Sequence, residues 1–295
     1  MRYGMPYMGS KNKIAEWIVD QLPKAKHFYD LFGGGGAISH CAVLSRKYEV
    51  VHYNELNSLI YKAFKMTVNG EFKNEKRWIS REDFHKLKYT DPYVNLCFSF
   101  GNNPFKNYAY AKDVEPCKKA LHYSICFNNN SLLSKIVDIK NLKYTSNNLH
   151  ERRLQLQHYL KNYIKDVELF CNTENGNVRN ILQSLERLER LQQLEILQSL
   201  GRLQSLEMTN LDYKDVQIEE DSIIYCDPPY ANTNDYKINF NRDEFYDWCR
   251  NQKNCFISEY TTPIDFKLVA EKCKICTFNN ENRKVTTEKL FTINN

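Results

Sequence analysis

The hydrophobic positions of the first part of the chain form short runs that end at glycine or polar residues, the pattern of buried strands. Residues 27–32 are apolar and aromatic and end at four consecutive glycines, and residues 37–44 continue with helical character. Residues 49–53 form a second apolar run, which closes on an Asn-Glu pair. This order predicts a βαβ unit with parallel strands and a right-handed crossover.

A second set of apolar runs lies far downstream. Residues 222–226 and 254–260 are predicted strands, and residues 242–252 between them have helical spacing. Residues 274–278 and 290–293 are predicted to form a closing antiparallel hairpin. The chain is therefore expected to be an α/β protein whose strands come from both ends of the sequence.

The composition changes between these two halves. Residues 70–177 are rich in Asn, Lys, Tyr and Phe, as in a turn-rich module that contacts a ligand. We expect this insertion to be mainly helical, with one hairpin near 97–110. The predicted division is a discontinuous catalytic domain of residues 1–69 and 178–295, with residues 70–177 as a separate recognition domain.

Leucine recurs at every third position over residues 182–206. Each step of three slips by about 60° around an α-helix, so these leucines cannot line one stripe. We expect a mostly buried or interrupted helix that breaks near Gly201, followed by a strand over 204–210. A leucine-zipper dimer is the alternative, and oligomerisation through this segment stays open.

Composition and charge narrow the class of protein. No apolar run reaches the roughly 18 residues of a membrane span, and the first residues lack a secretory signal, so we expect a cytoplasmic protein without a membrane partner. Residues 69–177 carry 17 Lys and Arg against 12 Asp and Glu, whereas residues 178–295 carry 15 against 19. Residues 1–68 carry 9 against 5, so the basic excess lies in the first and middle thirds of the chain, which suits a polyanion partner.

Ten cysteines raise the question of zinc or disulfides. Only Cys273 and Cys276 form a C-x-x-C pair, and a zinc ribbon needs a second pair or spaced histidines. We therefore expect no metal and mostly buried, reduced thiols.

The glycine turn is the first candidate site. Gly33, Gly34 and Gly35 follow Asp30 and Phe32 and precede a helix, where a ligand can approach bare backbone. The turn lacks both the Gly-Lys-Ser/Thr of a P-loop and the G-x-G-x-x-G of dinucleotide sites. Glu55 ends the next strand, where it can accept from ribose hydroxyls. Adenosine without a pyrophosphate fits these features, which indicates S-adenosylmethionine.

The second candidate site is Asp227-Pro228-Pro229-Tyr230, at the carboxyl end of an apolar strand. Two prolines stiffen the turn and remove N–H donors, so that carbonyls and the Asp227 carboxylate form a cluster of acceptors. Such a cluster suits an amino group with two hydrogens to donate, and Tyr230 offers a face on which a base can stack. Asp227 is expected to orient the amine rather than act as a strong base.

These segments, in this order, resemble the Dam-type (D12 class) adenine-N6 DNA methyltransferases, most closely the phage and prophage branch. The resemblance rests on residues 7–11, 30–35, 54–57, 212–213 and 227–230. It implies a Rossmann-like, seven-stranded mixed sheet of the S-adenosylmethionine-dependent methyltransferase type with an inserted target-recognition domain. It also implies cofactor contacts from Tyr7, Lys11, Asp30, Phe32, Gly33, Gly34, Gly35, Glu55, Asp212, Tyr213 and Asp227.

The resemblance implies DNA contacts as well. Ser258 and Tyr260 look like the family's S-x-Y segment beside the target pocket. Residues 99–108 keep only part of the recognition hairpin of the GATC enzymes, so GATC specificity is not expected. Amide side chains pair with adenine edges, and the candidate contacts here are Asn102, Asn103, Lys106, Asn107 and Tyr108.

The expected function is methyl transfer from S-adenosylmethionine to the N6 amine of an adenine flipped out of double-stranded DNA, without a metal or an obligate protein partner, in a bacterial or phage-infected cell. The open alternatives are methylation of cytosine N4 or of RNA, because the tetrad recognises an amine rather than a whole base. The third alternative is a DNA-binding module without catalytic activity.

Overall fold

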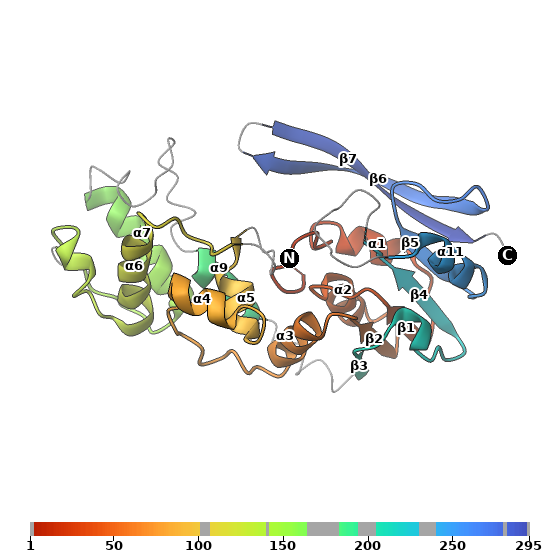
Figure 1. The fold of residues 1–295 in the computed structure, drawn as a ribbon, viewed down its shortest axis with the longest axis horizontal. Helices are drawn as coiled ribbons and strands as arrows, with labels where there is room; N and C mark the ends of the chain where they lie inside the picture. The colour runs from red at the N-terminus through yellow and green to blue at the C-terminus, as the bar shows by residue number, and fades with distance from the viewer. Residues whose placement is uncertain are drawn as a thin grey trace. The chain divides into compact units, whose positions relative to one another are not determined.

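The structure is a computed structural model that describes residues 3–100, 107–139, 142–163, 183–193, 205–229, 240–279 and 282–293 (Figure 1). Its contacts divide the chain into two compact units. The first unit comprises residues 1–4, 9–65 and 196–295, and the second comprises residues 5–8 and 66–195. Each unit is described by itself below.

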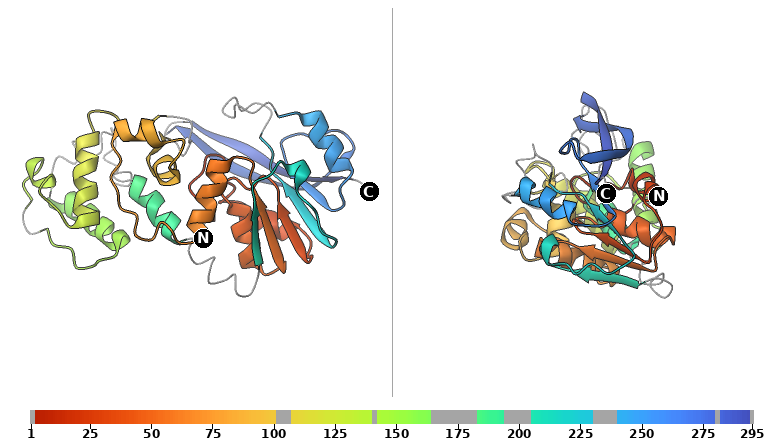
Figure 2. Two further views of the ribbon diagram at one scale, coloured as in Figure 1. Left: turned by 60° about the horizontal axis from the view of Figure 1, so that its bottom comes forward. Right: turned by 90° about the vertical axis from the view of Figure 1, so that its right-hand side faces the viewer.

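The first unit is built on a seven-stranded mixed sheet with the order β3-β2-β1-β4-β5-β7-β6. The first five strands of this order pair in parallel, and β7 joins β5 and β6 in antiparallel fashion. The sheet confirms the predicted fold class and the predicted βαβ unit (Figure 2). The strands are β1 (His27–Asp30), β2 (Val50–Asn54), β3 (Ser205–Thr209), β4 (Ser222–Cys226), β5 (Cys255–Ser258), β6 (Phe266–Asn279) and β7 (Asn282–Ile293).

Alternate side chains of the parallel strands enter two separate cores. On one face, the ring of Tyr53 stacks on Phe64 of α3, with 4.2 Å between the centroids, and Asp30 contacts Ser39 of α2. On the other face, Tyr29, Ile224 and Ile257 pack in one cluster with Phe245 of α11. Both faces of the sheet are therefore covered, as parallel strands require. The helices of this unit are α1 (Ala15–Gln21), α2 (Ala37–Ser45), α3 (Ser58–Val68) and α11 (Arg242–Arg250), with the 3₁₀ turn η4 (Tyr213–Asp215).

The closing hairpin is longer than its predicted strands. It is antiparallel as predicted, but β6 begins at Phe266, and Leu290 pairs with Ala270 rather than with a residue of 274–278. The predicted strand covers only residues 274–278, although residues 266–270 are also mostly apolar in the sequence.

The second unit is helical in the part of the chain that the structure describes. Its helices are α4 (Arg81–Leu87), α5 (Pro92–Phe98), α6 (Glu115–Phe127), α7 (Leu149–Tyr163) and α9 (Gln183–Gln193), with the 3₁₀ turn η2 (Leu133–Lys135). At the predicted hairpin, α5 ends at Phe98 and Ser99 then pairs antiparallel with Tyr108. The amide of Phe100 donates to the carbonyl of Asn107 and the amide of Ala109 donates to the carbonyl of Phe98, both at 2.7 Å, whereas residues 101–106 lie outside the described residues.

Helix α9 accounts for part of the leucine repeat. Leu185 and Leu188 are buried, as expected for a helix inside a core. The α9 residue Arg187 is also buried, and its guanidinium donates to the carbonyl of Ser99 at 2.6 Å, beyond the end of α5. The predicted break near Gly201 lies outside the described residues, and the strand predicted over 204–210 is confirmed as β3.

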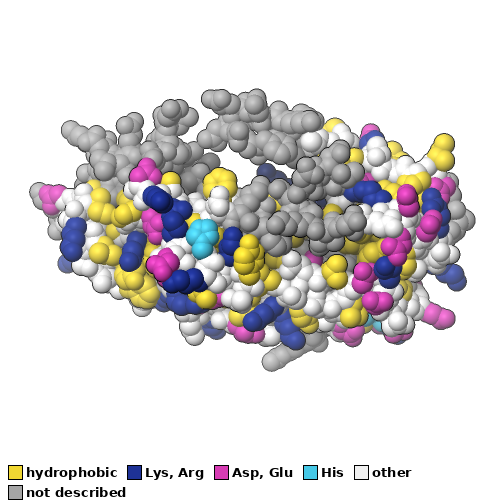
Figure 3. All heavy atoms as spheres, in the orientation of Figure 1, with side chains coloured by type: hydrophobic (Ala, Val, Ile, Leu, Met, Phe, Trp, Pro, Cys, Tyr) yellow, Lys and Arg dark blue, Asp and Glu magenta, His cyan; other side chains and the backbone are white. Residues whose placement is uncertain are grey.

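Charged side chains of both signs lie interspersed on the face shown in Figure 3. In the described part of the chain, no helix is both long and apolar enough to cross a membrane.

A test of the first core targets the residue that opens α2. Gly36 has φ +68°, and a Cβ at this position would lie 2.1 Å from Cε2 of Phe64. Gly36→Ala is expected to lose about 1–2 kcal/mol through the left-handed backbone. A further 1–3 kcal/mol is expected from overpacking. Urea unfolding of Gly36→Ala, Phe64→Leu and the double variant measures the coupling, since the smaller side chain should recover the packing loss. Additive losses would contradict this account of the turn.

Candidate active site

The glycine turn joins the end of β1 to α2 and is tied to the end of β2. The amide of Gly33 donates to the carbonyl of Asn54 at 2.8 Å, and the hydroxyl of Tyr53 donates to the carbonyl of Gly34 at 2.8 Å. A Cβ on Gly33 would lie 2.2 Å from the Tyr53 ring, and Gly34 has φ +49°. These constraints require glycine and leave a close-packed backbone turn at the carboxyl edge of the sheet.

Glu55 lies against this turn. Its carboxylate accepts from the amide of Gly34 at 2.8 Å and from the amide of Asn57 at 2.7 Å. Burial raises the pKa of Glu55, and these two amides offset part of the effect. Each carboxylate oxygen can accept more than one hydrogen bond. Glu55 is thus held in place beside the turn with acceptor capacity for hydroxyl groups.

Asp30 is fully buried at the end of β1. Its Oδ2 accepts from the amide of Ser39 at 3.1 Å and from the Ser39 hydroxyl at 2.6 Å, which ties the strand to α2. Burial raises the pKa of Asp30 to about 7, with the Ser39 hydrogen bonds opposing and Asp227 and Glu55 adding to the rise. Asp30 thus serves to anchor the turn.

Asp227 follows β4 at the same edge and forms an ion pair with a buried lysine. The Nζ of Lys11 lies 3.0 Å from Asp227 Oδ1 and 3.0 Å from Oε1 of Glu288, a residue of β7. Lys11 is 4% exposed and Glu288 is 1% exposed, whereas Asp227 is 19% exposed. Burial lowers the pKa of Lys11, but the two carboxylates outweigh it and hold the pKa above its ordinary value. The lysine therefore stays charged and fixes the Asp227 carboxylate.

The turn after Asp227 is held from α11. Arg242, the first residue of this helix, donates to the carbonyl of Pro229 and pairs with the buried Glu259 at 2.7 Å. Glu259 Oε1 also accepts from the amide of Tyr260 at 2.9 Å, so the turn and the end of β5 are linked through one guanidinium. Ser258 is buried, with its hydroxyl 2.8 Å from the hydroxyl of Tyr225. Tyr260 is exposed.

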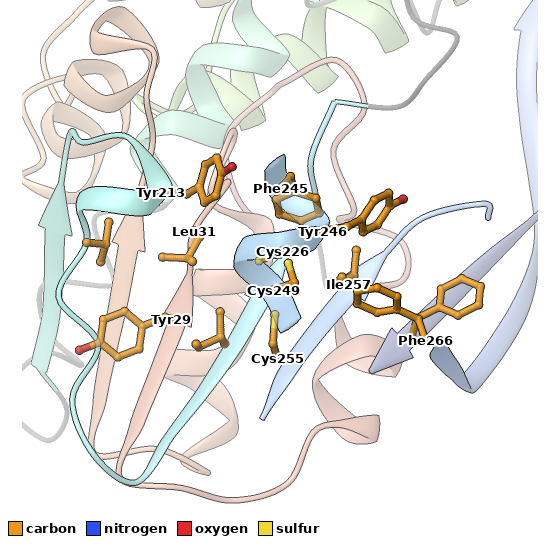
Figure 4. Close-up of a cluster of buried hydrophobic side chains, with 13 residues drawn as sticks. Tyr29, Leu31, Tyr213, Cys226, Phe245, Tyr246, Cys249, Cys255, Ile257 and Phe266 are labelled. Carbon is orange, nitrogen blue, oxygen red and sulfur yellow. The ribbon is translucent and has the colours of Figure 1, made fainter. Parts of the chain in front are cut away.

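An aromatic cluster flanks the turn on the α11 side of the sheet (Figure 4). Phe32 is half-buried, and its ring centroid lies 5.4 Å from Tyr213 and 5.6 Å from Phe245. Asp212 caps η4 by accepting from the amide of Lys214 at 3.1 Å. The predicted pair Asp212 and Tyr213 therefore lies beside Phe32, and Tyr213 is mostly a core side chain.

The remaining predicted residues lie outside the described residues or in the second unit. Tyr230, Asn102, Asn103 and Lys106 lie outside the described residues. Tyr7 is half-buried and belongs to the second unit.

Asn107 and Tyr108 also belong to the second unit, where Asn107 is exposed. Tyr108 is buried, and its hydroxyl donates to the carbonyl of Ile79 at 2.7 Å. We therefore assign Tyr108 a packing role.

Three residues at the edge were missed from the sequence. Glu288 and Arg242 lie in ordinary-looking strand and helix segments, where nothing distinguishes a buried charged group from a surface one. Asn54 lies in the segment of residues 54–57 that carries part of the family resemblance, but its role was not predicted from the sequence. Its amide donates to the carbonyls of Leu31 and Leu211 at 3.1 and 3.0 Å, so that it joins the strand ends.

Parallel strands that all end at an acidic edge, beside a glycine turn, define an α/β methyltransferase-like fold. The sequence profile of the D12 class N6 adenine-specific DNA methyltransferases matches residues 7–280. The chain therefore belongs to this family, and it is a DNA methyltransferase that acts on adenine.

Two further comparisons do not refine the family assignment. No curated protein matches the chain. Among solved structures, it is similar to HI0767 of Haemophilus influenzae, a protein assigned as a methylase, with 11% sequence identity and a TM-score of 0.32 over 97% of this chain and 90% of that one. This TM-score is too low to support an argument.

The buried ion triad of Lys11, Asp227 and Glu288 predicts that the free energy of unfolding depends on the balance of its charges. Lys11→Met leaves two uncompensated carboxylates and is expected to cost about 3–5 kcal/mol in urea unfolding. Adding Glu288→Gln should recover part of this loss, because one of the two charges is removed. Lys13→Met, at an exposed position two residues away, serves as the control. Equal stability of Lys11→Met and Lys13→Met would contradict the triad.

Asp30 predicts a pH dependence of stability. Its pKa is about 7 in the folded protein and 3.8 ordinarily, so the folded state binds the proton more tightly. Its contribution is therefore largest at low pH and falls as the pH rises from about 4 through 7, by up to about 1.4 kcal/mol per pH unit. Asp30→Asn should flatten the curve between about pH 5 and 7 in urea unfolding. The exposed Asp20→Asn should leave it unchanged, and a wild-type slope in Asp30→Asn would contradict the assignment.

Proposed function

We propose that this enzyme transfers the methyl group of S-adenosylmethionine to the N6 amine of an adenine that is flipped out of duplex DNA at a short specific sequence. The observation that carries this proposal is the placement of Asp227 and the glycine turn at one edge of one sheet. The family membership supports DNA adenine as the acceptor.

The charge of the edge supports the cofactor. Glu55 and the two carboxylates that share the single ammonium of Lys11 leave the edge with a negative potential, which favours a sulfonium and an ammonium group. Glu55 beside Gly34 is suited to the ribose hydroxyls, and the bare turn leaves room for the methionine part. The half-buried ring of Phe32, supported by the buried Tyr213, offers aromatic surface for the cofactor adenine.

The tetrad supports amine chemistry. The exocyclic nitrogen of adenine is a poor nucleophile because its lone pair is conjugated with the ring. Acceptors on the Asp227 carboxylate and the turn carbonyls hold both N–H bonds, which directs the lone pair at the methyl carbon. The N–C bond forms as the C–S bond breaks, and the electron pair of the broken bond stays on sulfur as a neutral thioether. The methylated amine then loses its extra proton to solvent water.

Lys11 and Arg242 act as positioning residues in this scheme. Lys11 keeps the Asp227 carboxylate ionised and fixed, and Arg242 holds the Pro229 carbonyl from below the turn. The acceptor cluster is thereby organised before the base arrives, which avoids reorganisation during transfer.

The second unit is proposed as the recognition domain. Residues 69–177 carry 17 Lys and Arg against 12 Asp and Glu, and phosphate contacts by Lys and Arg position a protein on duplex DNA. Flipping the base costs a few kcal/mol, which these contacts repay.

Methyl transfer from labelled S-adenosylmethionine to duplex DNA tests the proposal, with the modified nucleoside identified by mass spectrometry after digestion. The expected product is N6-methyladenine. Asp227→Ala should lower the rate at least about 100-fold, as loss of one preorganised group does. Calorimetry should show that this variant still binds the cofactor.

The exposed Asp215→Ala, on η4 of the same unit, is the matched control and should keep wild-type activity. N4-methylcytosine as the product, or methylated RNA in place of DNA, would redirect the assignment. Wild-type activity in Asp227→Ala would refute it.

A further inference from the structure

Three cysteine thiols converge in the core beneath the tetrad. Cys226 ends β4, Cys249 lies in the last turn of α11, and Cys255 begins β5. Their Sγ atoms all lie within 4.8 Å of one another, and all three residues are fully buried (Figure 4). The cluster is separate from the acidic edge and takes no part in the proposed methyl transfer.

The convergence follows from the strand register. Cys226 pairs with Ile257 and Ile224 pairs with Cys255, so both thiols project from the same face of neighbouring parallel strands. Helix α11 packs over this face and adds Cys249 from above. The cluster therefore joins β4, β5 and α11. The spacing of the three cysteines in the sequence is not that of a known metal-ligand motif.

The sulfur positions suit one shared ion. Bonds of about 2.3 Å from one pyramidal trivalent centre, with about 100° between them, put three sulfurs about 3.5 Å apart. The three Sγ atoms lie within 4.8 Å of one another, so a shift of at most about 1.3 Å brings them to this spacing. A disulfide is less suited, because Cys226 and Cys255 are diagonal rather than directly paired in the sheet.

The apolar surroundings of the cysteine cluster favour a bound species without a net charge. The cluster is packed among apolar and aromatic side chains, which include Leu31, Ile224, Phe245 and Ile257. A net charge in such a core is costly. Three thiolates around a trivalent centre are neutral overall, whereas three thiolates around a divalent ion leave a negative charge.

We propose that Cys226, Cys249 and Cys255 form a three-sulfur binding site for a trivalent thiophilic metalloid of the arsenite type. Neutral arsenous acid enters, three As–O bonds break and three As–S bonds form. The three thiol protons leave with the hydroxyl groups as three water molecules. Arsenic stays trivalent, so no oxidant or reductant is required.

Occupancy would join the carboxyl end of β4, the start of β5 and the end of α11 covalently. Cys226 immediately precedes Asp227, so the bound state should also stiffen the support of the tetrad. The site stands on the sulfur geometry alone and does not depend on the proposed methyl transfer.

Native mass spectrometry after long incubation with sodium arsenite, a few degrees below the melting temperature to allow local opening, tests the site. The background carries Cys273→Ser and Cys276→Ser, which removes the C-x-x-C pair. One adduct is expected, with the mass of one arsenic atom less three hydrogens. A two-sulfur adduct would instead retain a hydroxyl group. Tm should rise with arsenite concentration, because the bound arsenic stabilises the folded state.

Cys249→Ser and Cys255→Ser are near-isosteric and should each abolish the three-sulfur adduct and the rise in Tm. Cys41→Ser, at a buried thiol of α2 outside the cluster, is the matched control and should keep both. The proposal is overturned if the folded background protein takes up no arsenic. It is equally overturned if Cys249→Ser keeps the three-sulfur adduct, or if Cys41→Ser loses it.

Discussion

The concentration of carboxylates at one edge of the sheet is the constraint on which the site depends. Parallel strands bring Asp30, Glu55 and Asp227 to that edge, and the hairpin adds the buried Glu288. Like charges in a low dielectric repel strongly, so each must be stabilised. Asp30 meets this need with a raised pKa and Glu55 with backbone amides, whereas Asp227 and Glu288 share the ammonium of Lys11.

This division of charge gives the edge two kinds of surface. Around the glycine turn, the carboxylate of Glu55 has backbone amides and no full cation in its described contacts, which suits a cationic cofactor. At Asp227 the lysine fixes the carboxylate, which suits a neutral amine that must be oriented rather than deprotonated. Arg242 supports the same turn from α11. The part of the edge proposed for the cofactor and the part proposed for the acceptor amine therefore differ in how their carboxylates are neutralised.

Sequence patterns predicted the parts of the fold that follow from local chemistry. Apolar runs that end at the glycine turn and at the tetrad identified β1, β2, β4 and β5, because buried parallel strands are continuously apolar. The start of β6 was missed although residues 266–270 are mostly apolar in the sequence.

The site was predictable where a motif marked a backbone turn, as at Gly33–Gly35 and Asp227. Glu288 and Arg242 were not, since only the strand order and the docking of α11 bring them to the edge. The same reasoning explains the cysteine cluster, whose members are far apart in the chain and show no ligand spacing. The structure of the complex with S-adenosylhomocysteine tests the central claim most directly. Its sulfur is predicted to lie between the Gly33–Gly35 turn and the Asp227 turn, with Glu55 on the ribose hydroxyls. A ligand bound away from the carboxyl edge of the parallel strands would contradict the account.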